Sequence, residues 1–345
     1  MTLNADHNAT NKGQRRLRRF AHPKGKKARV LPEEAKTSNR KDILPVYDFG
    51  KIVATKHLVR SGQSDVYKGR RTIQDDHGGV EDSLGSDSIQ DVAIKVYRGE
   101  TTKRSWKHCK EEVSILINLS PHPNLLGMLQ YFRKPQPAIV TRFVTGGSLY
   151  QQLYKYGYFV PNKAHEVLYG LGQGLQHLHS HNIVHRDFKS PNILLDLYPS
   201  LHPVIIDLGH GTLLPSETTG DEDQQYRAHF VTATSFWRPP EMITDQLYSR
   251  KTDMYALGIV MWEILTGKIP YDNKRSSWVY KYVAQEKGRP DLSVLSHLPD
   301  VTPDHVALMQ KLWHHDPTKR PSATEFLAEL RRLSPRSCAH GQGSC

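Results

Sequence analysis

The chain has 345 residues, 37% of them hydrophobic and 24% charged, with a net charge of +12. Its three cysteines, Cys109, Cys338 and Cys345, are too few and too scattered for a disulfide-built fold. Its longest apolar run, around Met254–Leu265, is too short to cross a bilayer, so no transmembrane segment is predicted and a globular core is expected.

The first 42 residues form a basic tail, with twelve Lys/Arg against four Asp/Glu. The tail has few large apolar residues, so it is predicted to be disordered. The runs Gln14–Arg19 and Lys24–Lys27 suit contact with nuclear-import machinery, nucleic acid or acidic lipid surfaces; a solvated tail without a partner is the simpler interpretation. No apolar stretch follows the early charges, so we expect an intracellular protein, cytoplasmic, with nuclear entry left open.

Ordered elements are expected from about residue 46, with strands first and helices after them. A polar, glycine-containing loop is predicted over Thr72–Gln90. The predicted strands are Lys56–Val59, Asp65–Gly69, Val92–Tyr97, Leu125–Phe132 and Ala138–Val144, and the predicted helices are Thr102–Leu119, Ala164–His179, Lys251–Thr266 and Thr302–Leu312. With a Gly146-Gly147 break between the two groups, this order predicts an α+β protein of two lobes.

The strongest chemical signal is the run from His185 to Asn192, which reads His-Arg-Asp-Phe-Lys-Ser-Pro-Asn. Asp187 is a carboxylate that can accept the proton of an incoming hydroxyl. Asn192, five residues later, offers a neutral oxygen to a hard cation such as Mg²⁺. Lys189 brings a positive charge that can meet phosphoryl oxygens.

Two further motifs complete a set. An apolar strand ends in Asp207-Leu208-Gly209, where a carboxylate at a tight turn can reach a metal. Val92–Lys95 is a buried-strand pattern that ends in a long cation, and the next helix carries Glu112 beside its apolar face. Glu111 lies about 100° around that helix, so Glu112 is the predicted partner of Lys95.

These motifs, in this order, resemble the signature set of eukaryotic protein kinases. The resemblance covers residues 50–333 and implies a bilobal fold, with a small β-rich N-lobe at about 50–144 and a larger helical C-lobe at about 147–333; residues 334–345 are predicted to be a disordered tail. It implies that Lys95 and Glu112 position phosphates, that Asp187 with Lys189 performs catalysis, and that ATP and Mg²⁺ are bound. Asn192 and Asp207 would hold the metal.

By the same resemblance, Thr141 is the gatekeeper, and Arg142–Val144 form the hinge that meets adenine. The full set implied to bind nucleotide is Val59, Ser61, Gly62, Ser64, Val66, Ala93, Lys95, Thr141, Arg142, Val144, Leu194, Asn192 and Asp207. Glu241 is expected to pair with Arg320, and Asp253 to anchor the catalytic loop from a central helix. Arg142 replaces the glutamate usual in the family, with little consequence expected for a hinge read through its backbone.

The glycine-rich loop departs from the family pattern. Val59, Ser61 and Ser64 occupy its three glycine places, and Gly62 lies one position away. Glycine there lets backbone N–H groups approach phosphates closely and adopt positive φ. Serines are small hydrogen-bond donors, so a working loop is predicted, with nucleotide affinity as the quantity at stake.

Within the family, the pattern around Tyr255–Glu263 and Phe143–Leu149 resembles the tyrosine-kinase-like group of serine/threonine kinases, and Lys189 favours Ser/Thr over Tyr. The implied partners are protein substrates and an upstream kinase. That kinase would phosphorylate Ser216, Thr218, Thr219, Thr232 or Tyr226, and Arg186 would bind the added phosphate. The alternatives are a tyrosine or dual-specificity kinase, a pseudokinase scaffold, a small-molecule kinase and a nucleic-acid binder.

Overall fold

A computed structural model describes residues 51–73, 88–99, 102–156, 163–197, 200–215, 224–228, 236–298 and 301–333, all within one compact unit, residues 39–345. The predicted tails, 1–42 and 334–345, lie outside the described residues. The same holds for four of the candidate phosphorylation sites, Ser216, Thr218, Thr219 and Thr232.

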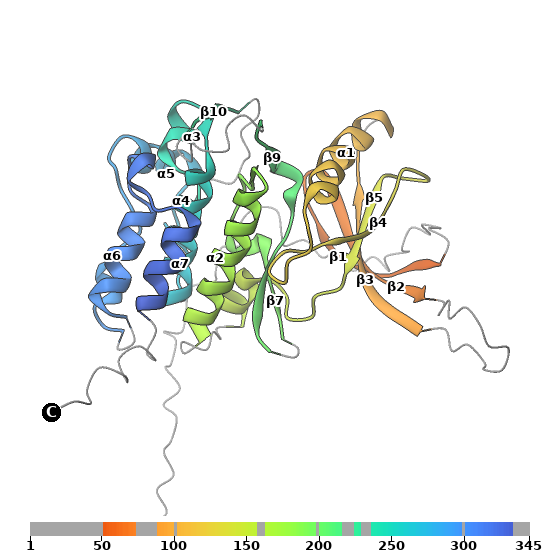
Figure 1. Ribbon diagram of the computed structural model, residues 1–345, viewed down its shortest axis with the longest axis horizontal. Coiled ribbons are helices and arrows are strands. Elements are labelled where there is room, and N and C mark those ends of the chain that lie inside the picture. Colours follow the sequence, from red (N-terminus) through yellow and green to blue (C-terminus); the bar gives the residue numbers. More distant parts are fainter. Residues whose placement is uncertain are drawn as a thin grey trace, which may run out of the picture. The chain divides into compact units, whose positions relative to one another are not determined.

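A five-stranded antiparallel sheet comes first in the chain (Figure 1). Its order is β1-β2-β3-β5-β4, with bounds Ile52–Arg60 (β1), Ser64–Ile73 (β2), Ser88–Tyr97 (β3), Met128–Phe132 (β4) and Ala138–Arg142 (β5). The strands are rich in β-branched and aromatic residues, which fit a pleated surface. Val92, Ile94 and Val96 alternate along β3 and are fully buried, so one face of the sheet carries a small apolar core.

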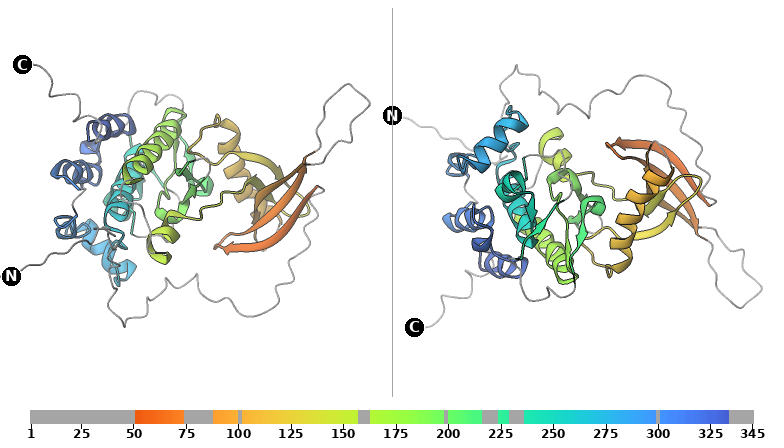
Figure 2. Two further views of the ribbon diagram at one scale, coloured as in Figure 1. Left: turned by 90° about the horizontal axis from the view of Figure 1, so that it is seen from below. Right: turned by 90° about the horizontal axis from the view of Figure 1, so that it is seen from above.

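Helix α1 (Thr102–Asn118) packs beside this sheet, as both views of Figure 2 show. Cys109 and Val113 of the helix are buried against Tyr97 and Ile139 of the strands. The helix thereby brings its Glu112 to the strand that carries Lys95. Its bounds match the predicted Thr102–Leu119 to within one residue.

The rest of the described chain is mainly helical. The elements are η1 (Gln151–Lys155), α2 (Ala164–Ser180), α3 (Pro240–Thr244), α4 (Arg250–Thr266), α5 (Ser276–Ala284), α6 (Pro303–Leu312) and α7 (Ala323–Arg332), with short turns η3 (Ser190–Asn192), η4 (Leu208–His210), η6 (Ser293–Leu295) and η7 (Pro317–Lys319). Helix α4 is buried on every side from Arg250 to Ile264, as expected of a helix through the centre of a core. Ser249 and Thr252 cap its start reciprocally.

Three small antiparallel pairs hold the loops that the motifs predicted to be functional. They are β6 (Ile183–Val184) with β9 (Thr212–Leu213), β7 (Ile193–Asp196) with β8 (His202–Ile205), and β10 (Tyr226–Arg227) with β11 (Leu247–Tyr248). The loop after β6 carries His185 to Asn192, and Asp207 follows β8. The His185–Asn192 loop therefore runs from the end of β6 to the start of β7, and Asp207 lies just after the end of β8. Short paired strands thus hold the ends of both segments.

The prediction of an α+β fold with a β-rich N-lobe and a helical C-lobe is confirmed. Several strand bounds were wrong. β1 starts at Ile52, because its antiparallel pairing with β2 runs out to Arg71, and β3 starts at Ser88, inside the predicted loop Thr72–Gln90. Leu125 makes an isolated bridge to Ile205 before β4 begins.

Candidate active site

Lys95 lies between two carboxylates. Its Nζ is 2.6 Å from Oε2 of Glu112 on α1 and 2.6 Å from Oδ1 of Asp207, which follows β8. The hydroxyl of Tyr97 also donates to Oε2 of Glu112. The predicted pairing with Glu112 is present, and the neighbouring Glu111 is largely exposed. One ammonium group therefore joins the sheet, α1 and the turn after β8.

The charges in this cluster support one another. Burial opposes a charged lysine, but the carboxylates of Asp207 and Glu112 raise the pKa of Lys95 well above its ordinary value. Burial also opposes ionisation of Asp207, and Lys95 overcomes it, so the pKa of Asp207 is lowered. The cluster consists of one cation and two anions, which leaves negative charge for a further cation.

The turn at Asp207 is tightly built. Asp207 has φ 65°, in the left-handed region, and its Oδ1 accepts a hydrogen bond of 3.4 Å from the backbone N–H of Gly209. A Cβ added to Gly209 would lie 2.9 Å from Oε2 of Glu112 and 3.1 Å from Oδ1 of Asp207. A side chain at 209 would therefore push the Glu112 and Asp207 carboxylates aside, and glycine lets the ion cluster close around the turn.

Asp187 lies on the loop between β6 and β7 and is buried. Its Oδ2 is 2.8 Å from Nζ of Lys189 and accepts a 3.1 Å hydrogen bond from Nδ2 of Asn192. The same Nδ2 donates to the backbone carbonyl of Asp187 at 2.9 Å. The structure thus brings together the three motif residues that the sequence predicted.

A fully buried carboxylate, Asp253 of α4, anchors this loop as expected. It accepts hydrogen bonds of 2.9 Å from the backbone N–H groups of both His185 and Arg186, and Nε2 of His179 lies 3.0 Å from it. Arg186 has φ 65°, a conformation that these two bonds hold. The position of Asp187 is therefore set by the central helix.

Asn192 and Asp207 fit the ligands of a hard cation. Both amide hydrogen bonds of Asn192 use Nδ2, so its carbonyl oxygen Oδ1 faces away from Asp187. Asp207 uses Oδ1 for Lys95, and its side chain keeps 36% of its surface exposed. An amide oxygen and a carboxylate oxygen are ligand types that Mg²⁺ accepts.

Five of the residues predicted to line the nucleotide site share one face of the sheet: Val59, Val66, Ala93, Lys95 and Thr141. Val66 lies opposite Lys95 in the β2–β3 register and opposite Val59 in the β1–β2 register. Ala93 is two residues from Lys95 on the same face and lies opposite Thr141. The turn that connects β1 to β2 contains Ser61, Gly62 and Ser64, and the hydroxyls of Ser61 and Ser64 are 3.0 Å apart.

The hinge region is tied to the helical lobe. The chain after Val144 pairs with β7, through Ser148 opposite Leu194. Nη1 of Arg142 donates to Oδ2 of Asp196 on β7. The side chain that replaces the glutamate usual in the family is thus paired with β7, a contact that no sequence motif indicates.

Arg186 packs against Thr212 and Tyr248. Its Nη1 donates to Oγ1 of Thr212 at 2.8 Å, and its guanidinium lies 4.4 Å from the Tyr248 ring centre. Tyr226, the one described candidate for modification, pairs with Tyr248 in the β10–β11 ladder. Reception of a phosphate by Arg186 stays a prediction.

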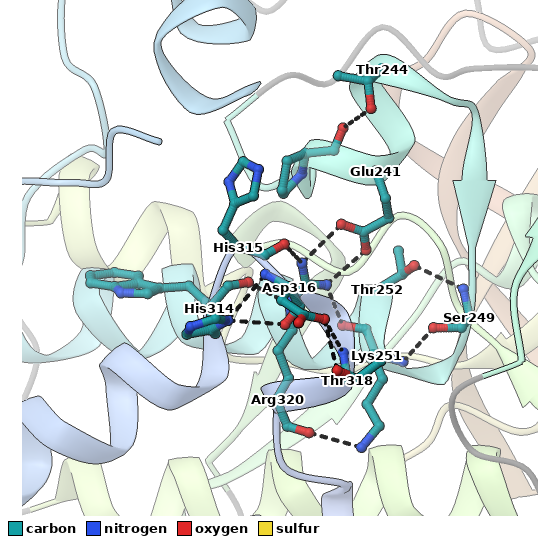
Figure 3. A network of polar contacts seen from close by, with 12 residues as sticks. Glu241, Thr244, Ser249, Lys251, Thr252, His314, His315, Asp316, Thr318 and Arg320 are labelled. Carbon is teal, nitrogen blue, oxygen red and sulfur yellow. Dashed lines mark hydrogen bonds and ion pairs between the residues drawn. The ribbon is translucent and has the colours of Figure 1, made fainter. Parts of the chain in front are cut away.

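A second buried ion pair was predicted between Glu241 and Arg320, and it is confirmed. Nη1 and Nη2 of Arg320 bind Oε1 and Oε2 of Glu241 at 2.7 and 2.8 Å, as Figure 3 shows. The pair joins the start of α3 to the turn before α7. It lies outside the Lys95 cluster and has a structural role.

Glu263 on α4 is a buried carboxylate that the motifs did not reveal. Its Oε1 accepts hydrogen bonds from the hydroxyls of Tyr154 at 2.6 Å and Ser190 at 2.8 Å, and its Oε2 accepts from Nε1 of Trp237 at 2.7 Å. Ser190 follows Lys189 in the catalytic loop. Glu263 therefore connects that loop to η1 and to the segment before α3.

We expect the stability difference between the wild type and Glu263→Gln to depend on pH. Burial outweighs the three hydrogen bonds and raises the pKa of Glu263 from 4.5 to about 7. The folded state therefore holds a proton that the unfolded state has lost, so the stability from Glu263 is fully present below pH 4.5 and is lost as the pH rises to about 7. Urea denaturation should show the wild type losing about 3 kcal/mol relative to the variant over that interval. A constant difference would contradict this assignment.

Comparison with known proteins identifies the family. The chain is 32% identical over 284 residues to a dual specificity protein kinase, pyk3, of Dictyostelium discoideum, covering 79% of this chain and 20% of that protein. It is 31% identical over 261 residues to the serine/threonine-protein kinase STY46 of Arabidopsis thaliana, covering 75% and 43%. It is 30% identical over 249 residues to mitogen-activated protein kinase kinase kinase 13 of Mus musculus, covering 72% and 23%.

The chain thus spans less than half the length of each of these relatives. No helix in the described part of the chain is both long enough and apolar enough to cross a membrane. Residues 76–330 match the protein kinase domain, and the chain belongs to the protein kinase family.

Proposed function

We propose that this protein transfers the γ-phosphoryl group of ATP to serine and threonine hydroxyls of protein substrates, in intracellular signalling. Family membership implies ATP as donor and a protein as acceptor. The observation that carries the proposal is the Lys95–Glu112–Asp207 cluster, which has its ion pairs formed while Asp187 and Asn192 are held on the adjoining loop. The proposed kinase domain spans 50–333, with lobes at about 50–144 and 147–333.

In this proposal the nucleotide lies against the face of the sheet that carries Lys95. The nucleotide would contact Val59, Val66, Ala93 and Thr141 on that face. Leu194 of β7 would contact it from the helical lobe, and the backbone of Arg142–Val144 would bind adenine. Lys95, held by Glu112, would bind phosphate oxygens. Asn192 and Asp207 would hold Mg²⁺, which when bound neutralises negative charge on the phosphates.

Asp187 would orient the acceptor hydroxyl and take its proton. The hydroxyl oxygen then bonds to the γ-phosphorus, the bond from that phosphorus to the β,γ-bridging oxygen breaks, and ADP leaves. Lys189, 2.8 Å from Asp187, places a cation where the transferred group carries negative charge. Asp253 supports the step by fixing the loop backbone.

The test is transfer of radiolabelled γ-phosphate by the full chain with Mg-ATP, followed by phosphoamino-acid analysis. We expect labelled serine and threonine. Label on tyrosine would favour a dual-specificity or tyrosine kinase, a class that the pyk3 relative's name includes. Absence of label on any protein substrate would contradict the proposal.

A pseudokinase scaffold is the second candidate, and one observation favours it. None of the three family glycine places, now Val59, Ser61 and Ser64, holds a glycine. A scaffold of this kind would show no transfer in the labelling assay, including after treatment with an activating kinase. The catalytic groups oppose this candidate, since Lys95, Glu112, Asp187, Asn192 and Asp207 are all present.

We further propose a cytoplasmic protein, regulated by an upstream kinase acting between Asp207 and Glu241. A solvated basic tail, residues 1–42, is the simpler interpretation; a tail with a partner would contact nuclear-import machinery or acidic surfaces. The proposed regulation by phosphorylation rests on the family resemblance and on the hydroxyl residues between Asp207 and Glu241.

A further inference from the structure

The turn between β1 and β2 is closed by side chains. Ser61 and Ser64 make four polar contacts with each other. Ser61 N–H donates to the Ser64 carbonyl at 2.8 Å, and Ser64 N–H donates to the Ser61 hydroxyl at 3.1 Å. The Ser61 hydroxyl also lies 3.1 Å from the Ser64 carbonyl and 3.0 Å from the Ser64 hydroxyl. A Cβ added to Gly62 would meet nothing within 4 Å. The turn therefore takes its shape from this serine pair.

Asp65 follows the turn and is 4% exposed. Side chains alternate across a strand, so Asp65 lies on the face opposite Val66, which is the face away from Lys95. Its carboxylate therefore reaches neither the ion cluster nor the face proposed for the nucleotide. A carboxylate buried there needs cations.

Three basic side chains surround this carboxylate. Nε of Arg60 donates to its Oδ1 at 2.8 Å, Nε2 of His57 lies 3.2 Å from the same oxygen, and Nε of Arg98 lies 3.1 Å from Oδ2. Arg60 and His57 belong to β1, and Arg98 follows β3. Asp65 thus links the strands on both sides of its own.

Arg98 also holds the tip of the turn. Its Nη2 donates to the carbonyl of Ser61, and its backbone N–H donates to the carbonyl of Gln63 at 2.7 Å. Arg98 is three residues after Lys95 on the same chain segment. The turn is therefore fixed to the strand that carries the proposed phosphate-binding lysine.

We propose that Asp65 and Arg98 are positioning residues that hold the Ser61–Ser64 turn in its nucleotide-binding conformation, replacing the backbone freedom that glycines supply in the family. The proposal rests on the proposed function, because it assigns the turn to ATP. The turn is ordered before ATP arrives, so ATP binding does not have to supply its ordering entropy. Loosening the turn weakens ATP binding before and during transfer equally, so KM for ATP rises and kcat stays nearly constant.

The experiment compares full-chain Asp65→Asn and Arg98→Gln with the wild type. KM for ATP should rise about tenfold with kcat within about twofold, and a non-hydrolysable ATP analogue should bind about tenfold more weakly. Arg98→Lys, which keeps the charge, should recover part of the affinity. Glu329→Gln is the control, since Glu329 pairs with Lys311 at 2.8 Å in the helical part of the chain, outside the sheet, and it should leave KM unchanged.

An unchanged KM and an unchanged analogue affinity in folded Asp65→Asn would overturn the proposal. If Asp65→Asn fails to fold, Arg60→Gln provides the test, because Arg60 is 67% exposed and its loss removes one of the two arginines at the carboxylate. A smaller rise in KM in that variant supports the proposal, and an unchanged KM overturns it. If the wild type transfers no phosphate, the proposed function fails, while analogue binding by the same variants still decides the role of Asp65.

Discussion

Replacing Asp187 by asparagine should lower kcat for phosphoryl transfer by about 10²–10⁴-fold, the usual contribution of a positioned general base. Asparagine has nearly the same shape but cannot take the proton of the acceptor hydroxyl. Its amide oxygen can still accept from Lys189 and Asn192, which now bind Oδ2 of Asp187. The loop should therefore keep its conformation, and KM for ATP should change by less than about threefold.

The measurement is steady-state transfer of labelled phosphate, paired with thermal unfolding of the same preparation. Asp272→Asn is the control, because Asp272 is an exposed carboxylate outside the site and its replacement should leave kcat unchanged. A folded Asp187→Asn protein with near-normal kcat would remove Asp187 from the mechanism. Loss of activity together with a large fall in the unfolding midpoint would make Asp187 a structural residue instead.

The proposed catalytic groups could be picked out from the sequence because most of them belong to short contiguous motifs. His185 to Asn192 places the proposed base and a proposed metal ligand within one loop, and the apolar strand before Asp207 predicts the turn that exposes its carboxylate. The choice of Glu112 over Glu111 followed from helical periodicity, and the 2.6 Å contact with Lys95 agrees with it. In such motifs the residues are close in sequence, so one loop or one helical turn determines their relative positions.

The family resemblance implied some contacts between distant segments, such as the Glu241–Arg320 pair, but contacts outside the family motifs could not be predicted. Glu263 lies 109 residues from Tyr154 and 73 from Ser190, and Arg142 lies 54 from Asp196. A hydrogen bond of this kind depends on how two elements pack, and no sequence period encodes it. The Asp65 cluster is closer in sequence, but its partners lie on neighbouring strands whose register only the fold determines.

The second large effect is expected at Arg320. Its side chain is completely buried, binds both oxygens of Glu241, and donates to the carbonyls of His314 and Lys251 at 2.8 and 3.1 Å (Figure 3). Arg320→Met would leave the Glu241 carboxylate buried without its partner. Breaking a buried pair from one side costs about 3–5 kcal/mol, so the free energy of unfolding should fall by that amount in urea denaturation.

Two further variants test whether the destabilisation of Arg320→Met comes from the unpaired Glu241 charge or from lost packing. Lys311→Gln removes an exposed pair with Glu329, 2.8 Å apart, and should cost at most about 1 kcal/mol. The double variant Glu241→Leu/Arg320→Met removes both charges, so it should be less destabilised than the sum of the two single variants. Additive losses would mean that the pair itself contributes little. In that case the carbonyl hydrogen bonds of Arg320 would account for its burial, and its guanidinium would stabilise the turn before α7 without help from Glu241.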